Sequence, residues 1–165
     1  DLALPKKGLP RARSTVGDGE TSSLMPVACV AVVGKLNEPL FLEDKCKESD
    51  GPDGAMNMRK IVHAALDVIE ERALRTDSVN TQYLGLLYPT DEHAVYGYIS
   101  NMKIKFIVVL TSDVEASDNS AKQIFDQIHR LYIDTVCNPF YKLGNPLASL
   151  GFCELAELML KKSLG

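Results

Sequence analysis

Several features that mark common functional classes are missing from this sequence of 165 residues. The longest unbroken apolar run is Val27–Val33, whereas a helix needs about 20 apolar residues to cross a bilayer. Lys and Arg (18) do not outnumber Asp and Glu (22). The chain therefore lacks the surplus of cations typical of nucleic-acid binders and of basic membrane-surface domains. We expect no nucleic-acid partner and no direct membrane insertion.

Signatures of catalysis and of cofactor binding are also scarce. No Gly-rich loop joins a predicted strand to a helix, as phosphate binding would require, and the four cysteines contain no C-x-x-C pair. His63, His93 and His129 are isolated from one another, without a second ligand at metal spacing. His63 and Asp67 are spaced i,i+4 and could form an acid–base or metal pair, but a solvated contact on a helix face explains this spacing better. We expect neither an enzyme nor a cofactor, and the scattered cysteines indicate a reducing compartment such as the cytosol.

The composition divides the chain into a short extension and one domain. Residues 1–24 hold several prolines and glycines, charges of both signs and no periodic apolar pattern, which predicts a disordered N-terminal extension. The domain is expected over residues 25–165. Its predicted elements follow the order β-β-α-β-β-β-α-α.

Hydrophobic periodicity predicts these elements and their layers. Val27–Val33 and Phe106–Leu110 are apolar on both faces, so helices must cover both sides of one sheet. The short connections between the last three strands predict an antiparallel meander. The last three predicted strands are Tyr83–Pro89, Val95–Ser100 and Lys103–Thr111. The predicted helices have apolar residues from Met58 to Ile69 and from Ala121 to Val136, and a last amphipathic helix covers about Leu147–Leu164. A loop is predicted at Glu43–Ala55.

The first predicted helix carries more apolar surface than one sheet face covers. Ala64 and Val68 form a second small apolar stripe beside the core stripe, and such an excess often faces a partner. Asp67 lies at the edge of this excess. Composition alone favours the simpler interpretation of Asp67 as a solvated carboxylate.

Three stretches of the sequence together resemble a known family. They are VHAALDVIEE (62–71), YLGLLYPTDEHAVYGYISNMKIKF (83–106) and CNPFY (137–141). In order and spacing they resemble the sedlin family of small subunits of transport-protein-particle (TRAPP) tethering complexes. Within that family they resemble the sedlin-like branch more than sedlin itself. The resemblance covers about residues 25–141.

The resemblance implies a longin, or SNARE-like, fold of the α+β class, with a five-stranded antiparallel-type sheet, one helix on one face and two on the other. It implies a non-catalytic assembly subunit of a complex that tethers vesicles in endoplasmic reticulum-to-Golgi and Golgi traffic. The whole complex acts as a guanine-nucleotide exchange factor for Rab-family GTPases, mainly through other subunits. The implied partners are other TRAPP subunits and, indirectly, a Rab-family GTPase. The implied location is the cytoplasm, peripheral to endoplasmic reticulum and Golgi membranes.

The resemblance also raises the weight of Asp67, because the matching acidic residue of the family is functionally sensitive and associated with partner binding. The strand from Tyr83 is expected at an edge of the sheet, and an apolar edge strand favours a constitutive partner. The candidate partner-binding residues are Asp67, His63, Ala64, Val68 and Tyr83.

Two alternative functions stay open. The chain could be the small chain of a clathrin-type adaptor or another longin-type trafficking module. It could also be a small hydrolase or thiol enzyme that uses Cys137 or His63, in which case one cysteine should react fast because its pKa is depressed.

Overall fold

The computed structural model of the chain describes residues 27–44, 51–75, 82–111 and 118–147, together with the pairs 153–154 and 157–158. The predicted extension 1–24 and most of the predicted last helix lie outside the described residues. In the described part, neither helix combines the length and the apolar character needed to span a membrane. The elements are β1 (Val27–Val33), β2 (Pro39–Asp44), α1 (Gly51–Arg75), β3 (Tyr83–Pro89), β4 (His93–Ile99), β5 (Lys105–Thr111) and α2 (Asp118–Val136).

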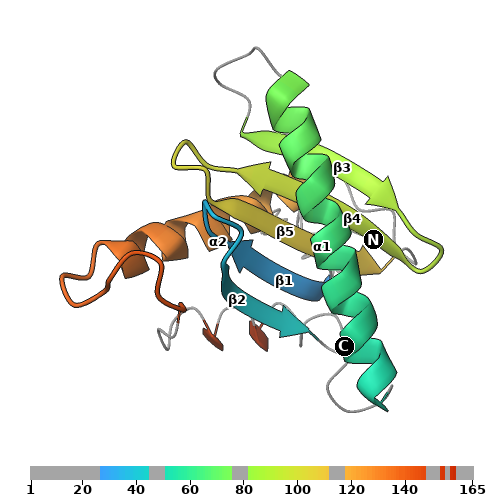
Figure 1. The fold of residues 1–165 in the computed structure, drawn as a ribbon, viewed down its shortest axis with the longest axis horizontal. Coiled ribbons are helices and arrows are strands. Elements are labelled where there is room, and N and C mark those ends of the chain that lie inside the picture. The colour runs from blue at the N-terminus through green and yellow to red at the C-terminus, as the bar shows by residue number, and fades with distance from the viewer. Residues whose placement is uncertain are drawn as a thin grey trace, which may run out of the picture.

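The five strands form one antiparallel sheet in the order β2-β1-β5-β4-β3. β1 pairs with both β2 and β5, so that Val33 lies opposite Pro39 on one side and Lys105 on the other. Helix α1 carries the chain from one edge of the sheet to the other across its front face, and α2 lies behind the sheet (Figure 1). This α+β, longin-like arrangement confirms the predicted fold class. It also confirms that β3 is an edge strand.

Each face of the sheet has its own hydrophobic core. All seven residues of β1 are buried, because alternate side chains contact opposite helices. The α1 side buries Met58, Val62, Ala65, Leu66 and Ile69 against the small side chains of β1 and the centres of β4 and β5. The α2 side buries Ala121, Ile124, Phe125, Ile128 and Tyr132 against the other face. The two predicted helical stripes are therefore confirmed as core.

The predicted loop Glu43–Ala55 is too long at both ends. β2 continues to Asp44, since Glu43 and Asp44 pair with Val30 and Cys29 of β1, and backbone pairing does not require apolar side chains. α1 already begins at Gly51. Pro52 is compatible with this start, because the first turn of a helix leaves its N–H groups without intrahelical partners.

Two glycines, opposite each other in the β3–β4 pair, shape the β3 edge. Gly85 has a φ of 72°, a conformation that residues with a Cβ rarely adopt, and the register shifts on both sides of it. A Cβ at Gly97 would lie 2.8 Å from Cδ1 of Leu87. Leu87 is buried in the core beneath α1, and it occupies the space that any larger residue at position 97 would need.

After α2 the chain turns back to the opposite edge of the sheet. Helix α2 ends at Val136, two residues before Asn138 and Pro139, which the sequence predicts as its stop. The backbone N–H of Leu147 donates to the carbonyl oxygen of Leu40 on β2 at 2.8 Å. Leu147 is buried in the core of the α2 side. The edge strand β2 is therefore contacted by a segment of the same chain.

Candidate interaction surface

The outward face of α1 presents most of the residues that the sequence singles out. Asp67, His63 and Ala64 are exposed, because the neighbouring Ala65 and Ile69 turn toward the sheet and are fully buried. The side chain of Asp67 makes no hydrogen bond or ion pair with any other described residue. The described part of the fold therefore does not use its carboxylate.

Val68 differs from Ala64, its neighbour in the predicted apolar stripe. Its side chain is only half-exposed, because it packs against the core cluster on the α1 side. Of the two residues in that stripe, Ala64 is therefore the one exposed to solvent.

Tyr83 lies on the other face of the sheet, under α2. Its hydroxyl donates to Oδ1 of Asp118 at 3.2 Å, and its ring contacts the ring of Phe125 edge-on, with 5.9 Å between centroids. The ammonium of Lys122 lies 5.2 Å from the ring centroid. Burial, together with the negative charge of Asp118, raises the pKa of Tyr83 well above its ordinary value. The candidate residues therefore belong to two surfaces, which the sheet separates.

The backbone of edge strand β3 is partly engaged by α1. The guanidinium of Arg72 donates to the carbonyl oxygens of Leu84 at 2.9 Å and Leu87 at 3.1 Å. The hydroxyl of Tyr88 donates to the carbonyl oxygen of Ile61 at 2.6 Å. The two Arg72 bonds occupy backbone acceptors of β3, and all three bonds attach the strand to the helix. The chain itself therefore protects part of this edge.

A groove of about 380 Å³ lies between α1 and the β1–β2 hairpin. We call it the α1–β2 groove. Residues from β1 and α1 form its apolar floor, while Arg59 and His63, one turn apart on α1, are exposed and form its rim. Of the candidate residues, only His63 lines the groove. The floor residues are Ala31, Val33, Val62 and Leu66.

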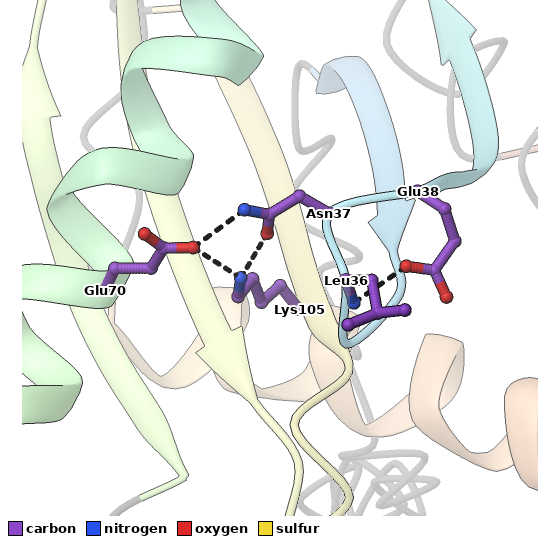
Figure 2. A network of polar contacts seen from close by, with 5 residues as sticks. All are labelled: Leu36, Asn37, Glu38, Glu70 and Lys105. Atoms are coloured by element: carbon purple, nitrogen blue, oxygen red, sulfur yellow. Dashed lines mark hydrogen bonds and ion pairs between the residues drawn. The ribbon is translucent and has the colours of Figure 1, made fainter.

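A polar network that includes the groove residue Asn37 joins three elements (Figure 2). The ammonium of Lys105, at the start of β5, lies 3.0 Å from Oε1 of Glu70 on α1 and also donates to Oδ1 of Asn37 in the β1–β2 turn. The amide of Asn37 donates to the same Glu70 oxygen at 2.8 Å. Asn37 adopts a φ of 62°, a conformation that Asn tolerates better than most residues. We call these three residues the Asn37–Glu70–Lys105 network.

The network buries one charge and leaves the other half-exposed. The side chain of Lys105 is 6% exposed and that of Glu70 is 48% exposed. The hydrogen bond from Asn37, and then the hydrogen bond and charge of Lys105, lower the pKa of Glu70 below its ordinary value. Reasoning from the sequence missed this network. The available signal was Lys105 itself, a charged residue that begins an otherwise apolar strand.

The histidine and cysteine proposed for catalysis have ordinary structural surroundings. Cys137 is exposed just beyond the end of α2. His63 lies on the groove rim. Among the described residues, no group of three or more His, Cys, Asp or Glu side chains could hold a metal ion.

His129 belongs to an aromatic cluster under α2. Its Nδ1 lies 3.3 Å from the hydroxyl of Tyr98, and its ring lies edge-on to Phe106 at 5.6 Å between centroids. Burial lowers the pKa of His129, although the charge of Asp126 acts in the opposite direction. Burial therefore favours the neutral form of this histidine, which is partly buried and has the Tyr98 hydroxyl as its polar contact.

The comparison with known families agrees with the fold. The family model for sedlin matches residues 32–162. The chain belongs to the sedlin family. This membership confirms the resemblance carried by the three sequence stretches, and the match includes α1, α2 and most of the residues of both cores and of the α1–β2 groove.

Relatives of the chain extend over most of its length. A Dictyostelium discoideum protein named trafficking protein particle complex subunit 2-like protein is 40% identical over 129 residues, which are 78% of this chain and 91% of that protein. The Mus musculus protein of the same name is 36% identical over 137 residues, 80% of this chain and 95% of its own length. Trafficking protein particle complex subunit 20 of Saccharomyces cerevisiae is 27% identical over 169 aligned positions, 81% of this chain and 96% of that protein.

Proposed function

We propose that this protein is a non-catalytic assembly subunit of a TRAPP complex. Its work would be to hold neighbouring subunits together in endoplasmic reticulum-to-Golgi and Golgi traffic. Family membership and the names of the relatives support this assignment. The partners are other TRAPP subunits and, through the assembled complex, a Rab-family GTPase. The protein would act in the cytoplasm, peripherally at endoplasmic reticulum and Golgi membranes.

The exposed carboxylate of Asp67 carries this proposal at the level of residues. A charged side chain on the outward face of a helix, without a partner among the described residues, contributes little to the stability of the domain. The same side chain can contribute to binding when a neighbouring subunit covers it. A docking role therefore predicts that Asp67 can be changed without unfolding the protein, at the expense of assembly.

The test replaces Asp67 with tyrosine and measures co-purification with other TRAPP subunits. Asp134→Tyr is the matched control, because Asp134 is also an exposed aspartate on a helix but belongs to α2, on the opposite face of the sheet. We expect both variants to fold, as judged by circular dichroism, and only Asp67→Tyr to reduce recovery of the other subunits. Unchanged recovery with Asp67→Tyr would remove Asp67 from the interface. Recovery of the wild-type protein with adaptor large subunits instead would contradict the TRAPP assignment.

A further inference from the structure

The α1–β2 groove is a second feature of α1, distinct from the surface around Asp67. Helix α1 crosses over β3, β4 and β5, and most of β1 and β2 lies to one side of it (Figure 1). The small and branched side chains of Ala31 and Val33 do not fill the angle between that side of the helix and the hairpin. The result is an apolar hollow of about 380 Å³, within the range of roughly 300–1,000 Å³ typical of sites that hold small ligands or side chains.

The two ends of the groove differ in charge. At one end Glu70 is already bonded to Lys105 and Asn37. At the other, Arg59 and His63 are exposed and make no hydrogen bond or ion pair with any other described residue. An anionic group would therefore be attracted to the Arg59 end, since the charge of Glu70 is already compensated by that of Lys105. The network also bonds the side chain of Asn37, which lines the groove.

The length of the groove limits what can lie in it. Arg59 and Leu66 are seven positions apart on α1, which corresponds to roughly 10 Å along the helix axis. About three residues of extended polypeptide cover that distance. An occupant that satisfies both the floor and the rim therefore has one or two aliphatic side chains with a carboxylate close to them in sequence.

We propose that the α1–β2 groove binds a short extended segment of a partner protein, in which aliphatic side chains fill the floor and a carboxylate pairs with Arg59 beside His63. The choice of a protein partner rests on the proposed function as an assembly subunit. Residues 1–26 of this chain suit the rim less well, because four Lys and Arg residues there outnumber three Asp and Glu residues.

The test uses the full chain and synthetic peptides, so that no TRAPP subunit is needed. Each peptide carries two adjacent leucines in a glycine–serine background and one glutamate placed one to four residues before or after them. A matched peptide has glutamine in place of glutamate. Binding is followed by the methyl NMR signals of Ala31, Val33, Val62 and Leu66 in titrations to roughly 1 mM peptide. Arg59→Glu is the test variant, and Lys60→Glu is its control, because Lys60 is the adjacent exposed cation but does not line the groove.

We expect at least one glutamate peptide to shift these four sets of methyl signals. Its glutamine counterpart and the Arg59→Glu variant should each weaken binding roughly tenfold or more, as expected for loss of a charge-assisted hydrogen bond, while Lys60→Glu should change it less than about twofold. The proposal is wrong if no peptide shifts the groove signals, including the case in which another part of the chain already fills the groove. Equal effects of the two charge reversals, or equal binding of the glutamate and glutamine peptides, would also overturn it. Failure of peptide binding leaves the subunit assignment intact. If the wild-type protein binds the peptides but is not recovered with other TRAPP subunits, the subunit assignment fails and the groove still binds peptide.

Discussion

Truncation of Glu70 should destabilise the protein more than removal of the lysine to which it is bonded. In Glu70→Ala, the ammonium of Lys105 stays buried and keeps only Asn37 as a partner among the side chains of the network. In Lys105→Met, the buried charge disappears and the apolar stem is retained. The carboxylate of Glu70 can then be solvated, because its side chain is already 48% exposed.

The magnitudes follow from this asymmetry. An incompletely paired buried charge costs several kcal/mol when it is fully desolvated. Here the half-exposed site admits water, so we expect Glu70→Ala to lower the free energy of unfolding by about 1–2 kcal/mol. Lys105→Met should lower it by less than about 1 kcal/mol, since replacing a buried ion pair by an apolar side chain is often close to neutral.

Urea denaturation of the single and double variants tests the reasoning, with free energies obtained by linear extrapolation. In the Lys105→Met background, Glu70→Ala should cost no more than about 0.5 kcal/mol, because no buried charge remains to be left without its partner. Glu71→Ala is the control. It removes a neighbouring carboxylate that pairs with Arg75 at 2.6 Å on the exposed surface, and such pairs are worth about 0.5 kcal/mol or less. If Lys105→Met proves as costly as Glu70→Ala, or if the cost of Glu70→Ala is the same in both backgrounds, the network does not act as described.

The same network predicts a pH dependence with a defined sign. The pKa of Glu70 is lowered in the folded protein from its ordinary value of 4.5. Its contribution to stability is therefore present above pH 4.5 and is lost as the pH falls through the lowered value. Glu70→Gln should lose less stability than the wild type between pH 5 and pH 3. Parallel losses would contradict the assignment of a lowered pKa to Glu70.

Three further variants test the cores and the attachment of β3. Because burial lowers the pKa of His129 from 6.5, its contribution to stability should fall as the pH drops below 6.5. The urea midpoint of His129→Phe should therefore change less between pH 7 and pH 5 than that of the wild type. Gly97→Ala forces a Cβ against the buried Leu87 and should lower the melting temperature through a cost of about 1–3 kcal/mol; an unchanged melting temperature would show that Leu87 moves freely. Tyr88→Phe removes the bond to the Ile61 carbonyl and should cost about 0.5–1.5 kcal/mol in urea titration, with faster amide exchange in β3 as a second measure.

The candidate surface could be predicted only in part. The exposure of Asp67 and His63 follows from helical periodicity, since the core stripe of α1 determines which arc faces solvent. The position of Tyr83 does not follow from such a pattern. The register of β3 shifts between Tyr83 and Gly85, so the alternation of the rest of the strand does not give the face of Tyr83. Only the packed structure shows Tyr83 under α2.

Local patterns in the sequence were sufficient to predict the types of the elements, the presence of helices on both faces of the sheet, and the family. These properties depend on neighbours within a few positions along the chain. The Asn37–Glu70–Lys105 network depends instead on residues separated by 35 and 68 positions. The α1–β2 groove likewise combines residues of β1, β2 and α1. Their proximity is set by the strand order and by the path of α1 across the sheet. A hollow exists only where packed elements fail to meet, so no single segment contains the information that predicts it.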